Sequence, residues 1–356
     1  MSTTASGTGG LVTRSRGWFR HALPQKVILL SIGAAILVYP SAVLGYQADR
    51  FTLAIIYCII GLSVNTLMGY AGQISLGHQA FVGIGAFTAA YVATQMQMPF
   101  PIAIVIAAVL GGATAALLGF VALRIQGLYL ALITLAYGAL AERSIFGIQK
   151  FTGGGLGMPA DRPGYVNSDA AYAYLCLGVL ALLLLIDWRM MKTKFGRALL
   201  AIKSSELVAS SFGMNLVFYK VAAFVVAGAI AGIGGGLFAF KNERVVSQDF
   251  TFAVALTFVI MVVVGGLGNR VGVIIGSAFT SYLPVLLDWV GNKTGFQELI
   301  VLKIAIAALL LLLTITRFPG GIAQQLHPLL VWFSGKPFPR HAHHKGQPEG
   351  DPDGTS

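Results

Sequence analysis

Ten stretches of mostly apolar residues run through this chain and constrain its fold more than any other feature. A helix that crosses the hydrocarbon core of a bilayer needs about 20 such residues. Only 10% of the 356 residues are charged, against about 25% in a soluble domain, so the chain cannot cover a water-facing surface. We therefore expect an all-α, polytopic membrane protein with about ten transmembrane helices in contact with the lipid bilayer. The predicted helices cover residues 27–45, 51–68, 79–94, 102–123, 128–141, 172–186, 221–240, 250–264, 271–287 and 299–316.

Two of these runs, 128–141 and 250–264, are short for a full crossing. They are open to three interpretations: a tilted helix, a broken helix or a re-entrant segment. Non-helical backbone at membrane depth is tolerated only where it faces protein or a water-filled cavity. The count of ten helices depends on how these two runs are arranged.

The distribution of Lys and Arg predicts how the chain is oriented. With the N-terminus inside and ten crossings, most of the 24 Lys and Arg residues fall on the inner side, as the positive-inside rule requires. The same rule accounts for the net charge of +11 without a nucleic-acid partner. We predict cytoplasmic termini: a basic N-terminal tail at 1–26, a membrane domain at 27–320 that includes an inner basic segment at 187–220, and a partly disordered C-terminal tail at 321–356.

Motifs of catalysis are missing from the sequence. It contains no phosphate-binding G-x-x-x-x-G-K-[ST] loop, no H-E-x-x-H motif and no nucleophile elbow beside a plausible base. Cys58 and Cys176 both lie in apolar runs, which implies no disulfide framework. We expect a non-catalytic protein with no catalytic residues, no metal site and no cofactor. Lys303 lies close enough to the end of the last run to extend its ammonium to the interface, and the H-A-H-H at 341–344 is interpreted as part of a basic tail.

The stretch at 69–81, G-Y-A-G-Q-I-S-L-G-H-Q-A-F, places polar and glycine residues between two apolar runs. Polar groups at membrane depth are costly unless they face the bundle interior or a cavity. One interpretation is a broken helix that lines a substrate pathway, and the other is tight helix packing with polar side chains bonded between helices. The density of such residues favours a pathway. A second glycine motif, G-G-L-G at 265–268, also closes an apolar run and hints at an internal repeat. The candidate pathway residues are Asn65, Gly72, Gln73, Ser75, Gly77, His78, Gly265 and Gly266.

The inner basic segment contains a broken helical pattern of apolar residues between 196 and 215, and Gly213 is placed to end a helix. Such a helix either lies on the membrane surface or docks into a groove of a partner protein. Composition does not separate these two possibilities.

Blocks at 69–87, 128–135, 152–158, 196–240, 265–272 and 317–322 resemble, in this order, the permeases of branched-chain amino-acid ABC transporters of the LivM type. The resemblance covers roughly residues 30–325. It implies a multi-pass permease of the bacterial inner membrane, with 27–320 as the permease domain. It also implies three kinds of partner: a second permease of the LivH type, two cytoplasmic ABC ATPase subunits, and a periplasmic or extracellular substrate-binding protein.

The resemblance further assigns 187–220 as an EAA-type coupling loop, the segment that docks into an ATPase subunit. Glu206, Ala209 and Gly213 match its E-x-x-A-x-x-x-G pattern, and Arg197 and Lys203 are assigned to the same loop. The implied function is translocation of branched-chain or related amino acids, driven by ATP that the partner subunits hydrolyse.

Three positions depart from the family pattern. Ala139 stands where a Glu is common, Asp249 lies where a Ser-Pro is usual, and Ala255 lies in a run that often carries Ser and Glu. Related permeases move urea or short-chain amides, so these substrates remain an alternative. A stand-alone secondary transporter is a second alternative, although it would need acids or bases within its spans for ion coupling. An intramembrane enzyme is a third, and the constellation that it would need is not found.

Overall fold

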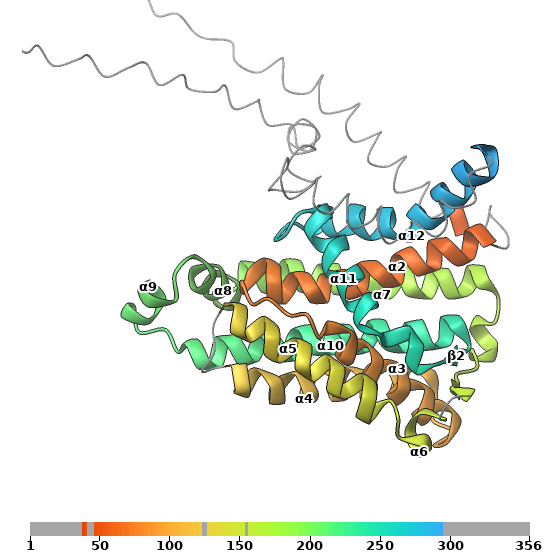
Figure 1. Ribbon diagram of the computed structural model, residues 1–356, viewed down its shortest axis with the longest axis horizontal. Coiled ribbons are helices and arrows are strands. Elements are labelled where there is room, and N and C mark those ends of the chain that lie inside the picture. Colours follow the sequence, from red (N-terminus) through yellow and green to blue (C-terminus); the bar gives the residue numbers. More distant parts are fainter. Residues whose placement is uncertain (1–37, 41–45, 123–126, 154–155, 295–356) are drawn as a thin grey trace, which may run out of the picture. The chain divides into compact units, whose positions relative to one another are not determined.

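The computed structural model describes residues 38–40, 46–122, 127–153 and 156–294 (Figure 1). The described part is mostly helical, as the sequence predicted. Two strands of two residues each, β1 (Met158–Pro159) and β2 (Arg244–Val245), form an antiparallel pair. The helices are α2 (Tyr46–Val64), which continues as a π-helix η1 (Asn65–Tyr70), α3 (His78–Thr94), α4 (Phe100–Ala122), α5 (Leu128–Leu140) with its π-helical continuation η2 (Ala141–Ile145), α6 (Gln149–Thr152), η4 (Gly164–Val166), α7 (Asp169–Lys192), α8 (Lys194–Ser204), α9 (Glu206–Ser211), α10 (Leu216–Asn242), η5 (Ser247–Phe250), α11 (Phe252–Gly265) and α12 (Arg270–Thr294).

Each predicted run from 51–68 to 271–287 contains a helix. Among the described residues, five helical stretches are long and apolar enough to cross a membrane: Gln47–Tyr70, Phe100–Val121, Leu128–Ile145, Asp169–Lys192 and Leu216–Asn242. Phe252–Gly265 and Arg270–Leu286 are shorter apolar helices. The run at 299–316, nearly all of 27–45, Lys303 and both predicted tails lie outside the described residues, so the count of ten and the position of the termini stay predictions.

α10 is the central helix, and it packs against α2, α3 and α4. Glycines make this close packing possible. A Cβ added at Gly235 would overlap the carbonyl oxygen of Val82 in α3, and one added at Gly228 would overlap the carbonyl oxygen of Gly111 in α4. Small residues at helix contacts are typical of membrane bundles, where close approach of backbones replaces the hydrophobic effect as a source of stability. On the other side of the bundle, α12 packs along α2.

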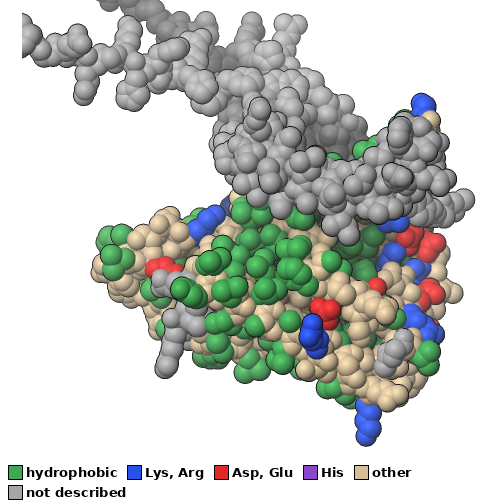
Figure 2. Space-filling model, in the orientation of Figure 1, with side chains coloured by type: hydrophobic (Ala, Val, Ile, Leu, Met, Phe, Trp, Pro, Cys, Tyr) green, Lys and Arg blue, Asp and Glu red, His purple; other side chains and the backbone are tan. Residues whose placement is uncertain are grey.

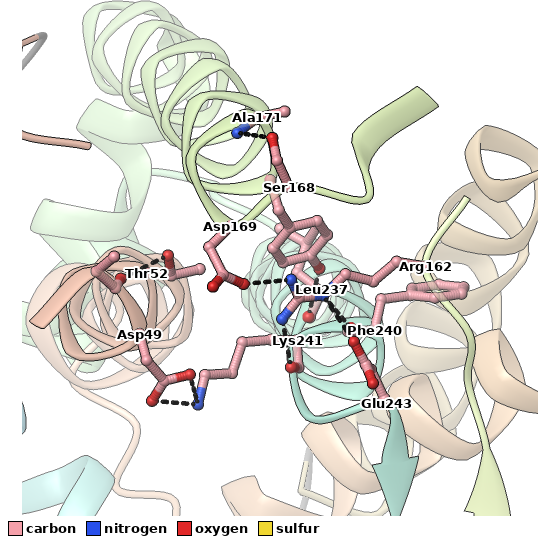
Figure 3. Close-up of polar contacts among 12 residues, drawn as sticks. Asp49, Thr52, Arg162, Ser168, Asp169, Ala171, Leu237, Phe240, Lys241 and Glu243 are labelled. Carbon is pink, nitrogen blue, oxygen red and sulfur yellow. Dashed lines mark hydrogen bonds and ion pairs between the residues drawn. The ribbon is translucent and has the colours of Figure 1, made fainter. Parts of the chain in front are cut away.

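The two ends of the bundle carry different elements. α8 and α9 lie at one end, whereas α6 and β2 lie at the other (Figure 1). At the β2 end, Arg162 closes the C-terminus of α10: its Nε and Nη2 donate to the carbonyl oxygens of Phe240 (3.1 Å) and Lys241 (2.9 Å) (Figure 3). Nη1 of Arg162 also donates to Asp169 (2.6 Å), the first residue of α7. A cation at a helix C-terminus is favourable, and this one holds the loop before α7 onto α10.

Large apolar side chains cover much of the outside of the bundle. Figure 2 shows hydrophobic side chains gathered over the middle of one face. Within the apolar windows of α4, α5 and α7, the buried shares are 33%, 28% and 22%, so most of these windows face outward. Contiguous apolar surface of this extent marks a surface that meets lipid or another protein. Examples are Val105, Val109 and Leu117 of α4, and Leu128, Tyr129 and Leu132 of α5.

Candidate functional site

The stretch at 69–81 is a break between two helices, as the sequence predicted. η1 ends at Tyr70, residues 71–77 form no helix, and α3 begins at His78. We call residues 71–77 the helix break. Gly72 has a φ of +68°, a conformation that glycine adopts readily and other residues adopt at a cost. π-helical turns such as η1 occur often at functional sites.

The helix break packs directly on α5. The Leu76 N–H donates to Oγ1 of Thr134 (2.9 Å), and a Cβ added at Gly77 would overlap the Thr134 carbonyl group. A Cβ added at Gly138 would lie 2.9 Å from the Cα of Gly77 and 2.5 Å from Nε2 of Gln79. Gly77 is therefore required for the close approach of the helix break to α5. The outer face of α5 is largely exposed.

The polar residues predicted in this stretch are buried: Asn65, Ser75 and His78 are 0% exposed, and Gln73 is 5% exposed. Nε2 of His78 lies 2.6 Å from Oγ of Ser63, which in turn donates to the carbonyl oxygen of Ala227 in α10. His78 thus bonds between helices, as the packing interpretation expects.

Other groups of the stretch have no such bond. Nδ1 of His78, Oγ of Ser75 and Oε1 of Gln79 have no hydrogen-bond partner among the described residues. The side of the helix break that faces outward carries Gly72 and Ile74, whose side chain is 41% exposed. That these residues line a pathway stays a prediction.

The two predicted sets of residues meet at the end of η1. From the pathway set, Oδ1 of Asn65 accepts a hydrogen bond from the Gly268 N–H (2.7 Å). From the coupling set, Nζ of Lys203 in α8 donates to the carbonyl oxygen of Gly69 (2.6 Å). An ideal Cβ on Gly72 would lie 3.0 Å from Cγ of Lys203. A Cβ added at Gly268 would lie 3.9 Å from Nζ of Lys203, so α8 borders both the turn after η1 and the turn between α11 and α12.

The second glycine motif lies beside this junction. Gly265 ends α11 and packs so closely on α12 that an added Cβ would overlap the Gly272 carbonyl group. Gly266 follows with a φ of +121°. The motif at 265–268 and the motif at 69–72 contact one another in space, since a Cβ added at Gly69 would lie 2.7 Å from the Gly268 nitrogen.

A buried acid–base group at the same end was not identified from the sequence. Oδ2 of Asp187 accepts a hydrogen bond from Oη of Tyr70 (3.1 Å) and forms an ion pair with Nε of Arg270. The Asp187 side chain is only 1% exposed. The group joins the last turns of α7 to η1 and to the first residue of α12. A signal was present, because Asp187 directly follows one apolar run, Arg270 directly precedes another, and both ends were predicted to lie inside.

The coupling segment consists of two short helices rather than one. The break falls at Ser205, whose Oγ accepts from the Val208 N–H (3.3 Å) and so caps α9. The apolar residues of the sequence pattern are separated accordingly. Those of α8 (Ala198, Leu199 and Ile202) are at most 5% exposed, whereas those after the break (Leu207, Val208 and Phe212) are 78%, 53% and 81% exposed. Gly213 follows α9 with a φ of +73°, which confirms it as the helix-ending residue.

The residues assigned to the coupling pattern have different environments. Glu206 begins α9, and its carboxylate lies 2.6 Å from Nζ of Lys220 in α10, whose side chain is 4% exposed. Ala209 is 1% exposed and packs inward. Arg197 is exposed and donates to the carbonyl oxygen of Lys192 (3.1 Å). Glu206 and Ala209 therefore attach α9 to the bundle and leave its apolar side chains free.

The three departures from the family pattern have distinct settings. Ala139 is exposed on α5, and Ala255 is fully buried in α11. Oδ2 of Asp249 accepts a hydrogen bond from the Val246 N–H (3.2 Å) at the start of η5. Burial raises the pKa of the Asp249 carboxyl group by more than this hydrogen bond lowers it. Asp249 thus has a local capping role that a proline could not supply.

Acidic residues, His and Cys are dispersed over the part of the chain that the structure describes. No three of them come together there in a way that could hold a metal ion. The acids with close partners pair singly with a Lys or Arg, as Asp187 does with Arg270 and Glu206 does with Lys220.

Comparison with known proteins places this sequence in a family. A family described as "Branched-chain amino acid transport system / permease component" matches residues 48–315. The "High-affinity branched-chain amino acid transport system permease protein LivM" of Escherichia coli is 29% identical over 87% of this chain and 78% of that protein. The protein of the same description from Salmonella typhimurium is 28% identical over 88% and 78%.

A relative of the second permease type also matches. The "Probable branched-chain amino acid transport permease protein LivH" of Methanocaldococcus jannaschii is 27% identical over 40% of this chain and 45% of that protein. The family match alone spans well over half of the present sequence. The chain is a multi-pass membrane protein, and it belongs to the family of permease components of branched-chain amino acid transport systems.

Proposed function

We propose that this chain is the permease subunit of an ABC importer that moves branched-chain or related amino acids across a bacterial inner membrane. ATP hydrolysis on two partner subunits supplies the energy, and a binding protein outside the membrane delivers the substrate. Family membership supports the class of transport system, and the names of the two LivM relatives support the class of substrate. Ten helices with both termini in the cytoplasm complete the proposed topology.

The observation that carries this proposal is the exposed apolar surface of α9. Leu207 of α9 and Phe212, which directly follows α9, are 78% and 81% exposed, and the pair of Glu206 with the buried Lys220 fixes this helix to the bundle. Exposed apolar side chains mark a surface that meets lipid or another protein, and membership in a family of transport-system components favours a protein partner. A helix that inserts such side chains into a groove is a recurring mode of recognition. We assign α9 as the helix that enters the ATPase subunit.

The second permease completes the pathway in this proposal. α5 and the outward side of the helix break at Ile74 offer the partner an apolar surface next to backbone that is not helical. The partial match to a LivH protein supports a related chain as the partner. Substrate would pass between the two permeases along this surface.

The test is reconstitution of the full assembly in liposomes, with uptake of radiolabelled leucine, isoleucine and valine measured with and without ATP. We expect uptake only when both ATPase subunits and the binding protein are present. Uptake by this chain alone would indicate a secondary transporter. Uptake of urea or a short amide in preference to the amino acids would overturn the assigned substrate.

The coupling assignment is tested with Phe212→Asp and Leu207→Asp. Each places a charge where an apolar contact is proposed, so the ATPase subunits should no longer co-purify. The matched control is Leu156→Asp, since Leu156 is 80% exposed at the opposite end of the bundle. Co-purification that is equal in all three variants would contradict the role of α9.

A further inference from the structure

Lys203 makes an unusual bond for a residue on the exposed surface of α8. Its ammonium donates to the carbonyl oxygen of Gly69 (2.6 Å), the second-last residue of η1. The last carbonyl groups of a helix have no N–H partner within the helix, and they attract a cation. The bond therefore joins α8 to the backbone at the point where the helix stops, 134 residues away in sequence.

The stem of Lys203 lies on the backbone of the helix break. An ideal Cβ on Gly72 would lie 3.0 Å from Cγ of Lys203 and 3.5 Å from its Cβ. A Cβ on Gly268 would lie 3.9 Å from its Nζ, so the ammonium also borders the turn between α11 and α12. Glycine at position 72 thus permits Lys203 of α8 to lie directly against the chain, because residue 72 has no side chain to separate them.

A short and continuous path connects this contact to the surface proposed to meet the ATPase. Leu199 and Ile202 are buried, so the end of α8 that carries Lys203 is packed on the bundle. Ser205 then caps α9, and the Glu206–Lys220 pair fixes its first residue. Only three residues separate Lys203 from Leu207. Force applied to α9 therefore reaches the backbone of 69–72 without passing through a flexible linker.

We propose that Lys203 is a positioning residue of the transport cycle. It holds α8 to the backbone at 69–72 so that the coupling segment and the helix break move together, and this contact persists throughout the cycle. The inference rests on the proposed function, because it assigns the route by which the ATPase acts on the pathway. A lysine that only capped η1 would give the same static contact but would leave the ratio of transport to ATP hydrolysis unchanged.

The first test compares Lys203→Met, Lys203→Arg and Lys150→Met in the reconstituted importer. Methionine keeps most of the stem but removes the donor. We expect Lys203→Met to bind the ATPase subunits normally and to lower the amino acid transported per ATP severalfold, because the donor that holds α8 to Gly69 is lost. Arginine retains a donor and should restore most of the coupling. Lys150→Met removes an exposed lysine from α6, at the other end of the bundle, and should behave as the wild type.

The second test replaces the bond with a covalent one. In a Gly72→Cys/Lys203→Cys variant the two Cβ atoms would be 3.5 Å apart, at the short end of the range of about 3.5–4.5 Å found in disulfides. We expect low coupling under reducing conditions and recovery on oxidation, since the disulfide takes over the role of the lysine. Gly72→Cys alone measures the cost of a side chain at a φ of +68°. Cys58 and Cys176 are buried and should not compete for the new thiols.

The outcomes separate this inference from the proposed function. Normal transport per ATP in Lys203→Met, or an oxidised double variant that hydrolyses ATP without transport, would overturn the role of Lys203 and leave the importer intact. Failure of the wild-type assembly to transport with ATP would instead overturn the proposed function itself.

Discussion

Nζ of Lys220 lies 2.6 Å from the carboxylate of Glu206, so the first residue of α9 is tied to the second turn of α10. The Lys220 side chain is 4% exposed and that of Glu206 is 24% exposed. Glu206 is thus an anchor for α9, and in the proposed function the contact with the ATPase subunit falls to the apolar residues that follow it.

Removing this anchor should destabilise the protein. Glu206→Gln leaves the Lys220 ammonium buried without a counter-charge, which costs about 3 kcal/mol when a buried pair is broken. We expect Tm in detergent to fall by roughly 5–10 °C, since the fall in Tm per kcal/mol becomes smaller as the chain becomes longer. Glu206→Met combined with Lys220→Met removes both charges and should recover most of the loss. A double variant as unstable as the single one would show that the pair is not the cause.

The buried group around Asp187 should behave as one unit. Asp187→Asn takes the negative charge away from Arg270, and Tyr70→Phe removes the 3.1 Å hydrogen bond to the same oxygen. We expect losses of unfolding free energy of about 2–3 kcal/mol and about 1 kcal/mol respectively. Because both variants affect Oδ2 of Asp187, the double variant should lose less than the sum. Additive losses in a double-mutant cycle would contradict the shared site.

Packing of α10 on α3 should depend on Gly235. In Gly235→Ala the added methyl group overlaps the Val82 carbonyl oxygen, so the helices must separate and the folded yield should fall severalfold. Gly178→Ala is the matched control, because Gly178 also lies within a helix, α7, and an added Cβ there meets no atom within 4 Å. Gain of helix propensity should make that control neutral or slightly stabilising. Folded yield is measured as the monodisperse fraction in size-exclusion chromatography.

The predicted orientation is testable by labelling single cysteines in sealed cells. The two variants are Leu207→Cys and Leu156→Cys. Leu207 lies in α9, whereas the Leu156 carbonyl oxygen accepts a hydrogen bond from Arg244 of β2 at the opposite end of the bundle, and both leucine side chains are well exposed. We expect a membrane-impermeant maleimide to label position 156 from outside and position 207 only after the cells are opened. Labelling of position 207 in intact cells would place α9 outside and exclude an ATPase partner for it.

The sequence was sufficient to predict most of the fold because the period and length of apolar runs determine it. Every predicted run within the described residues proved to be a helix, and the glycines at 69–77 correctly predicted a helix break. Gly213 follows α9 as expected, because the end of a helix commonly needs a residue with positive φ and this need is local in sequence.

Contacts between distant parts of the chain could not be predicted in the same way. Asp187 and Arg270 are 83 positions apart, and Lys203 and Gly69 are 134 apart, so no local pattern connects them. The single apolar pattern at 196–215 did not show that a serine cap would divide it into a buried half and an exposed half. Nor could residue type reveal that His78 bonds to Ser63, because the pathway and packing interpretations require the same residues.

The glycine contacts between α3, α4 and α10 also limit how the molecule can change shape. Where backbone meets backbone, as at Gly235 with Val82 and at Gly228 with Gly111, no side chains are available to rotate and so accommodate sliding. These three helices must therefore move as one rigid body. Whatever bending a working cycle demands has to be absorbed elsewhere in the molecule, where side chains separate the helices.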